Sequence, residues 1–127
     1  MANVLLVEPD IALARTYVQA LQHVGHEVVH VVSAQDAIMA ADQTQPDVVV
    51  LELRMAVHDG IEFLHEFRSY PEWQGIPVVV NSHITSSSLA PVQTALQGDL
   101  GVVATLYKPR TSLQQLISQV NQQVRMA

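Results

Sequence analysis

Several polar side chains that could form one charged site follow short apolar runs in this sequence of 127 residues. They are Glu8 and Asp10 after residues 4–7, Glu52 after residues 48–51, Ser82 after residues 78–80, and Lys108 after residues 102–106. Carboxylate oxygens can bind a divalent cation such as Mg²⁺, and they can also form ion pairs with a lysine. In open parallel sheets, functional residues gather at the carboxyl ends of the strands. We therefore expect these side chains to lie together if the apolar runs are parallel strands.

The charges of this site must balance. Glu8 and Glu52 would repel one another at close range unless a cation neutralises them, and the nearest candidates in the sequence are Lys108 and Arg54. We expect a permanent ion pair between Glu52 and Lys108. Arg54 is open to two interpretations: it points into the site, or it points into solvent as loop arginines usually do.

The histidines do not predict a metal site. His58 and His83 flank the expected charged site and could bind a metal together with Glu8 or Glu52. Single histidines in loops are far more often surface residues, so we expect no metal there. The remaining histidines show no spacing typical of metal ligands: His23, His26, His30 and His65.

The elements that would position these side chains alternate along the chain. Short apolar runs, typical of strands, occupy residues 4–7, 28–32, 48–51, 78–80 and 102–106. A segment with apolar residues at helical spacing follows each run, at residues 14–24, 34–41, 61–67, 89–96 and 113–124. Near-continuous valine without polar alternation indicates strands buried on both faces. The pattern predicts an α/β fold with a (βα)5 parallel sheet, covered by helices on both faces, and one domain over residues 1–127.

Short polar side chains predict where three of these helices begin. Each lies three residues before a group that can reach back to it: Asp59 before Glu62, Ser33 before Asp36, and Thr111 before Gln114. Pro91 fits only in the first turn of the fourth helix, because proline has no backbone N–H, and Gly98 should end that helix.

Composition excludes several classes of protein. Apolar residues make up 49% of the chain and charged residues 14%, which indicates a globular domain rather than a disordered one. No apolar run approaches the roughly 20 residues that span a bilayer, and the N-terminus lacks signal-peptide features. There is no cysteine, and the net charge of −6 argues against direct nucleic-acid binding. We expect a cytoplasmic protein that contacts neither membrane nor nucleic acid.

Residues 47–60, which read DVVVLELRMAVHDG, are the most informative stretch. A buried apolar strand runs into Glu52 and then into a loop that ends in Asp59 and Gly60. The stretch resembles the phosphoacceptor strand and loop of the receiver domains of two-component response regulators. The family pattern is an apolar strand, an aspartate, two residues, Met-Pro, two residues and Asp-Gly. Here Glu52 stands at the aspartate position and Ala56 at the proline position.

The resemblance covers the whole chain. A receiver pocket has two acids after the first strand, an acid after the third, a Ser or Thr after the fourth and Lys-Pro after the fifth. The matching residues are Glu8, Pro9 and Asp10, then Glu52, Ser82, Lys108 and Pro109. The resemblance implies a CheY-like, flavodoxin-like three-layer sandwich with strand order 2-1-3-4-5. It also implies phosphorelay signal transduction rather than enzymatic activity, with a histidine kinase or a downstream regulator as partner.

Two departures from the family pattern argue against phosphorylation. The second acid after the first strand is the more direct Mg²⁺ ligand in the family, and Pro9 occupies that position. Asp10 could swing inward, but we expect it to cap the helix that begins at Ile11. Glu52 is one methylene longer than aspartate, and a misplaced reacting group can cost a factor of about 100 in rate. We expect Mg²⁺ binding to be weak or absent, and no cofactor.

The switch residues of the family are incomplete as well. Ser82 matches the Ser or Thr with which receivers contact the phosphoryl group. The aromatic residue that the family places three positions before the lysine is replaced by Thr105. Tyr107 is the nearest aromatic residue, and we expect it on another side of the strand. The family's coupling of hydroxyl movement to aromatic rotation should therefore lack its second part.

These departures predict a pseudo-receiver that acts by protein–protein interaction without phosphorylation. Glu52 could mimic a phosphorylated aspartate, but a purely structural role is favoured, because one carboxylate charge poorly replaces a phosphoryl group of roughly −2. An authentic receiver that a histidine kinase phosphorylates, using Asp10 and Glu52, is one alternative. A flavodoxin-like small-ligand binder is the other, although the first loop, EPDIA, lacks the residues that cradle a phosphate.

Receivers usually bind partners through the face of the fourth helix, fifth strand and fifth helix. In this chain the polar side of the last helix carries Gln114, Gln115, Ser118, Gln119, Asn121, Gln122 and Gln123, with Arg125 at its end. The fourth helix adds Gln93, Thr94 and Gln97. We expect a signalling partner or a second copy of the chain to bind there by hydrogen bonds, with weak salt dependence.

Overall fold

A computed structural model describes residues 2–126, which fold around a five-stranded parallel sheet. The strands are β1 (Asn3–Val7), β2 (Glu27–Val31), β3 (Val48–Leu51), β4 (Val78–Ser82) and β5 (Val102–Tyr107). Their order across the sheet is β2-β1-β3-β4-β5, and every neighbouring pair is parallel. The predicted strand order and parallel pairing are confirmed.

The valine runs form strands that are buried on both faces. All residues of β3 and β4 are buried, as near-continuous apolar runs in central parallel strands should be. Along β1, Val4 and Leu6 join one hydrophobic core while Leu5 and Val7 join the other. Each strand therefore serves two cores, because successive side chains point to opposite faces of the sheet.

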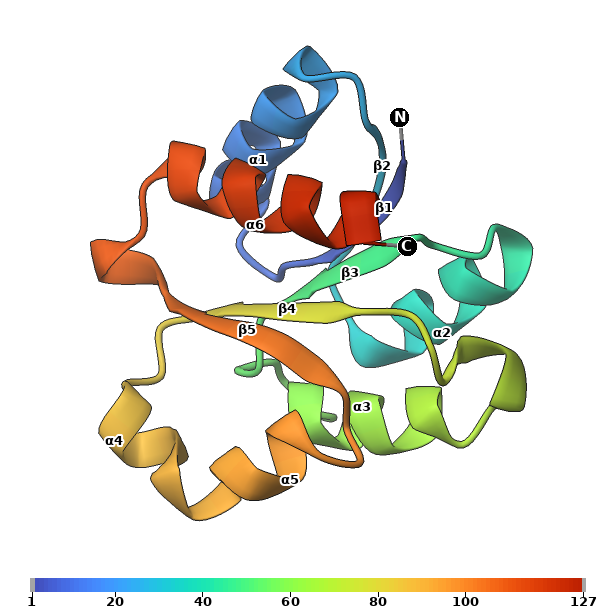
Figure 1. Cartoon of the computed structure of the whole chain (residues 1–127), viewed down its shortest axis with the longest axis vertical. Helices are drawn as coiled ribbons and strands as arrows, with labels where there is room; N and C mark the ends of the chain where they lie inside the picture. The colour runs from blue at the N-terminus through green and yellow to red at the C-terminus, as the bar shows by residue number, and fades with distance from the viewer. Residues whose placement is uncertain (1, 127) are drawn as a thin grey trace.

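Helices cover both faces of the sheet and produce three layers (Figure 1). The longer helices are α1 (Ile11–His23), α2 (Ala34–Gln43), α3 (Gly60–Arg68) and α6 (Leu113–Met126). Shorter pieces are α4 (Ser86–Leu89), α5 (Gln93–Gln97) and the 3₁₀ turns η1 (Pro71–Trp73), η2 (Ala90–Val92) and η3 (Lys108–Arg110). Helices α1 and α6 pack on one face, and α2, α3, α4 and α5 pack on the other.

Two of the three predicted helix caps are confirmed. The side chains of Asp59 and Ser33 accept hydrogen bonds from the backbone N–H groups three residues ahead. The third prediction is wrong by one residue. Ser112 caps α6, because its hydroxyl accepts from Gln115 N at 3.1 Å while the Gln115 side chain accepts from Ser112 N at 2.8 Å. Thr111 instead closes the preceding turn, where its hydroxyl donates to the carbonyl of Tyr107 at 2.8 Å.

The predicted fourth helix is divided into three short pieces. It begins earlier than expected, at Ser86, with Thr85 as its cap. Pro91 lies in the first turn of η2 rather than of α4, since a residue without a backbone N–H interrupts the helical hydrogen bonds. The helix resumes as α5 and ends with Gly98 at its cap, as predicted. Among residues 2–126, no helix has the length and apolar character needed to cross a membrane.

Candidate functional site

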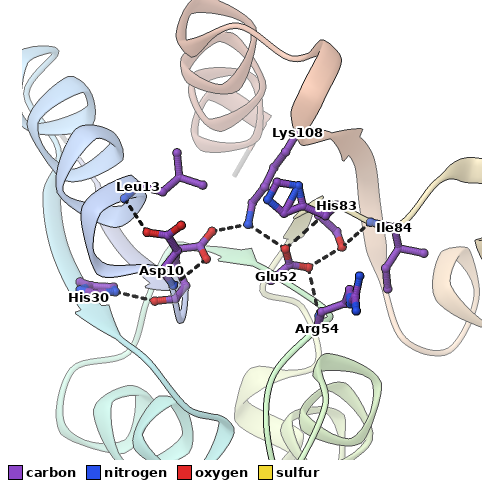
Figure 2. A network of polar contacts seen from close by, with 10 residues as sticks. Asp10, Leu13, His30, Glu52, Arg54, His83, Ile84 and Lys108 are labelled. Carbon is purple, nitrogen blue, oxygen red and sulfur yellow. Dashed lines mark hydrogen bonds and ion pairs between the residues drawn. The ribbon is translucent and has the colours of Figure 1, made fainter.

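Lys108 lies between two buried carboxylates at the carboxyl edge of the sheet (Figure 2). Its Nζ is 2.5 Å from Glu8 Oε1 and 2.7 Å from Glu52 Oε1. The three side chains come from the ends of β1, β3 and β5, which the strand order brings to one edge. The expected ion pair of Glu52 with Lys108 is present, and Glu8 joins it as a second carboxylate.

The carboxylate of Glu52 accepts three further hydrogen bonds. The hydroxyl of Ser82 donates to Oε2, and so does the backbone N–H of Arg54 at 3.0 Å. The backbone N–H of His83 approaches Oε1 at 3.3 Å. Both carboxylate oxygens are therefore occupied by donors from the protein itself.

These contacts shift the proton equilibria of the ion pair in opposite directions. Burial alone would raise the pKa of Glu52, but the hydrogen bonds from Lys108, Ser82 and the Arg54 backbone outweigh it, so this pKa lies below its ordinary value. Burial alone would lower the pKa of Lys108, but the bonds to Glu52 and Glu8 outweigh it and raise this pKa. Both groups are thus held in their charged forms at neutral pH.

Glu8 is anchored by its own neighbours as well as by Lys108. Its Oε2 accepts a hydrogen bond from the backbone N–H of Asp10 at 3.1 Å. Its carbonyl oxygen accepts from His30 Nε2 at 2.8 Å (Figure 2). His30 comes from β2, the neighbour of β1 in the sheet. This histidine therefore fixes the backbone of the site, a role that no feature of the sequence indicated.

Pro9 and Asp10 do not provide the oxygen ligands that Mg²⁺ requires. Pro9 has no side-chain oxygen, and Asp10 caps α1 by accepting from Leu13 N at 3.0 Å, as expected (Figure 2). The ammonium group of Lys108 also lies against the carboxylate oxygens that a cation would approach. Since Mg²⁺ favours near-octahedral oxygen coordination, the residues present do not fit it.

Arg54 contributes its backbone rather than its charge. Its side chain is exposed, and within residues 2–126 it forms no ion pair. Of the two sequence interpretations, the structure shows the solvent-facing one. Two carboxylates therefore face one ammonium group, and hydrogen bonds from backbone N–H groups supply the remaining stabilisation.

Gly60 holds the loop after β3 close to the site. Its N–H donates to the carbonyl of Leu53 at 2.8 Å. A Cβ at this position would lie 2.7 Å from Leu53 Cα and 3.0 Å from the carbonyl oxygen of Glu52, which is too close for any side chain. The Asp-Gly pair of the motif thus combines a helix cap with a close backbone approach.

The two switch-equivalent residues lie on neighbouring strands. Ser82 is fully buried, and its Cα pairs with that of Tyr107 across β4 and β5. Thr105 is exposed and pairs with Val80. The expectation that Tyr107 lies on another side of β5 is wrong, because residues two apart on a strand share a face. Tyr107 is half-buried on that face, beyond Thr105 towards the charged site.

The histidines flanking the site take separate roles. His58 Nδ1 lies 3.0 Å from Glu62 Oε2 on the surface, and His83 contributes its backbone N–H to Glu52. Within the part of the chain that the structure describes, His, Asp and Glu residues form no group of three or more suited to a metal ion. The backbone donors at Arg54 and His83 were missed from sequence, since every non-proline residue carries such a donor.

Comparison with known sequences points to one family. The model of the response regulator receiver domain matches residues 4–121. The KDP operon transcriptional regulatory protein KdpE of Escherichia coli (strain K12) is 35% identical over 82 residues, covering 65% of this chain and 35% of that protein. A protein-glutamate methylesterase/protein-glutamine glutaminase of Sulfurimonas denitrificans is 28% identical over 127 residues, covering 98% of this chain and 35% of that enzyme. The match thus spans about a third of the length of these curated relatives.

Comparison with solved structures confirms the fold. Chemotaxis protein CheY4 of Vibrio cholerae superposes with a TM-score of 0.85 at 24% identity, covering 96% of this chain and 98% of that one. A CheY-like receiver domain protein of Methanospirillum hungatei JF-1 gives a TM-score of 0.86 at 17% identity, covering 99% and 95%. The CheY-like, flavodoxin-like α/β sandwich is therefore the fold of this chain.

Proposed function

Because the chain belongs to the response regulator receiver domain family, we propose that it is a pseudo-receiver of a two-component system, an interaction module that works without phosphorylation. In this proposal residues 1–127 act as one domain that binds rather than catalyses, in the cytoplasm beside its signalling partners. The observation that carries it is the state of Glu52, the residue at the phosphoacceptor position, whose two carboxylate oxygens are both engaged.

A carboxylate in this state is a poor acceptor for a phosphoryl group. To attack phosphorus, an oxygen needs a free lone pair directed towards the incoming group. Oε1 faces Lys108 Nζ at 2.7 Å, and Oε2 accepts from the Ser82 hydroxyl and the Arg54 backbone. Phosphorylation would have to break this buried set of bonds first.

The surroundings supply no replacement for the family's metal ion. A phosphoryl group brings roughly two negative charges into a pocket that already holds Glu8 and Glu52. Mg²⁺ would offset them, but Pro9 cannot bind it and Asp10 caps α1 instead. Lys108 alone would have to neutralise all of these charges, which disfavours transfer strongly.

For the partner we propose the face formed by α4, α5, β5 and α6, which would contact a histidine kinase, a downstream regulator or a second copy of the chain. On α6 the exposed polar side chains are Gln114, Gln115, Ser118 and Gln122, with Arg125 at the end. The sequence led us to expect Asn121 on this surface, but its side chain is engaged within the fold. Its Oδ1 lies 2.6 Å from Nε2 of the buried His26, so it holds α6 against the turn before β2.

The test is exposure to a small phosphodonor. The protein is incubated with acetyl phosphate and Mg²⁺, and the intact mass is recorded before and after treatment with hydroxylamine. We expect no adduct. A phosphoryl adduct that hydroxylamine removes would show an authentic receiver and would overturn the proposal.

A restored variant serves as the positive control. The double change Pro9→Asp with Glu52→Asp returns the family's acids while leaving Ser82 and Lys108 in place. We expect this variant to bind Mg²⁺ and to take up phosphate. If it does neither, then Ser82, Lys108 or their surroundings have also lost the ability to support phosphorylation.

A further inference from the structure

Asn81 is a buried amide that follows three valines in β4 and lies next to the charged site. Its side chain is 2% exposed, and within residues 2–126 its Oδ1 has no hydrogen-bond partner. A buried carbonyl oxygen of this kind destabilises the folded state unless it accepts a hydrogen bond. Because β3 and β4 pair through Leu51 and Val80, the next residues along these strands, Glu52 and Asn81, are neighbours across the sheet.

The side chain of Asn81 points to the same face of the sheet as that of Glu52. Val50 and Val79, two residues before Glu52 and Asn81, both belong to the core beneath α1 and α6 (Figure 1). Since residues two apart on a strand share a face, Glu52 and Asn81 lie on this side as well. Lys108 follows β5 and must cross the end of β4 to reach Glu52 on β3.

Lys108 has one hydrogen-bond donor more than its two carboxylate partners use. An ammonium group carries three N–H donors, and the contacts with Glu8 and Glu52 account for two of them. The side chain is 4% exposed, and the residues that the structure describes provide no third acceptor for Nζ. One buried donor and one buried acceptor, on Lys108 and Asn81, thus remain without a protein partner on the same face of the sheet.

Tyr17 of α1 adds a third polar group to this place. The ring belongs to the core beneath α1 and α6 and is almost fully buried. Burial raises the pKa of the Tyr17 phenol, while the Asn81 side chain, as a hydrogen-bond donor, and the charge of Lys108 lower it in part. The NH₂ end of Asn81 therefore faces the phenol, which leaves Oδ1 free to accept from another group.

We propose that the chain binds one buried water molecule between Lys108 Nζ and Asn81 Oδ1. The water accepts the third N–H of Lys108, donates to Asn81 Oδ1 and forms its third hydrogen bond with the hydroxyl of Tyr17. Three polar partners are typical of a buried water. A cation would be repelled by the ammonium group, and an anion by the neighbouring carboxylates. A small neutral molecule that both donates and accepts fits these groups, and it links α1 to the ion pair of the charged site.

A crystal structure of the unaltered chain, at a resolution that defines ordered water, gives the direct test. We expect a water oxygen within about 3.2 Å of both Lys108 Nζ and Asn81 Oδ1. In Asn81→Leu, whose side chain has nearly the same shape without polar atoms, that water should be absent. Empty density between the two side chains, or an Asn81 amide in direct contact with Lys108, would overturn the proposal.

Thermal unfolding tests the same link in solution. If the water joins Asn81 to Lys108, Asn81→Leu should lower the Tm by about 4 °C, because a buried N–H loses its partner. If the amide were isolated, the same change would raise the Tm, since a buried polar group without partners would be removed. In the background of Glu52→Gln with Lys108→Met, which lacks the ammonium group, the loss should fall to half or less.

Asn121→Leu is the matched control. It removes another amide, whose Oδ1 contacts His26 on a different part of α6 and the turn before β2. The change should lower the Tm equally with and without the ammonium group of Lys108. A Tm that stays constant or rises in Asn81→Leu, or an equal loss in both backgrounds, would contradict a water shared by Asn81 and Lys108.

A milder background covers the case in which the Lys108 variant does not fold. Tyr17→Phe keeps the ring in the core and removes only the hydroxyl that completes the proposed site. The water should then be held by two groups instead of three, so the loss of Tm caused by Asn81→Leu should again shrink. Equal losses with Tyr and with Phe at this position would overturn the three-residue site.

Discussion

Lys108 and Glu52 form an ion pair of 2.7 Å between side chains that are 4% and 3% exposed. A surface pair of this kind contributes little, but a buried one leaves an uncompensated charge when either partner is removed. The same ammonium group contacts Glu8 at 2.5 Å, so the three side chains behave as one unit. This unit gives the site its most direct tests.

Replacing Lys108 by Met should destabilise the fold by about 3 kcal/mol, because two buried carboxylates lose their cation. Urea unfolding followed by circular dichroism measures the loss. Adding Glu52→Gln should recover part of it, and adding Glu8→Gln should recover more. Strictly additive losses in this series would mean that the three groups do not interact.

The ion pair of Glu52 with Lys108 should also make the stability of the fold depend on pH. The pKa of Glu52 is lowered from 4.5, so its contribution is present above that pH and is lost as the pH falls through the folded-state pKa. The pKa of Lys108 is raised from 10.5, so its contribution is present below that pH and is lost as the pH rises through the folded-state pKa.

The measurement is unfolding of the unaltered chain and of Glu52→Gln from about pH 3 to about pH 11. The difference between their free energies of unfolding should be constant between the two ordinary pKa values and should shrink on either side. A difference that does not vary with pH would contradict the assigned pKa directions.

Arg68 is expected to be a second centre of stability, away from the charged site. Its guanidinium group donates to five backbone carbonyls, those of Trp73, Gln74, Ile76, Leu100 and Gly101, at distances from 2.7 to 3.3 Å. It ties the segment before β4 to the segment before β5. Arg68→Met should cost about 3 kcal/mol, because several carbonyls lose their donors, whereas the exposed Arg125→Met should cost less than about 0.5 kcal/mol. Similar losses for the two variants would contradict this role.

Binding through the face of α4, α5, β5 and α6 should depend little on salt. The exposed side chains of α6 are mostly amides. Salt would therefore screen few charges, and few counterions would be released on binding. The affinity of a partner, or of self-association, should change less than about threefold between 50 and 500 mM salt. Sedimentation or calorimetry across this range provides the measurement. A steep loss of affinity would assign the contact to a charged surface elsewhere, such as Glu62 and Glu66 on α3.

Much of the fold was predictable because its signals are local and repeated. Uninterrupted valine runs indicate buried parallel strands, and the helical spacing between them leaves few arrangements other than an α/β sandwich. The caps at Ser33 and Asp59 follow from the same local chemistry. The fourth helix was predicted less well, because Pro91 leaves open whether a helix begins at the proline or is broken by it.

The charged site was predictable only as far as its side chains. From residue type and position at a strand end, we could predict that Glu8, Glu52, Ser82 and Lys108 lie together. The need to neutralise buried carboxylates then predicted the ion pair of Glu52 with Lys108. Tertiary structure alone decided the rest. In the folded chain the side chain of Arg54 points into solvent, and the backbone N–H groups of Arg54 and His83 donate to the carboxylate of Glu52. Lys108 also forms an ion pair with Glu8. Backbone donors are the same for nearly every residue, so only the folded path of a loop determines which of them meet an acceptor.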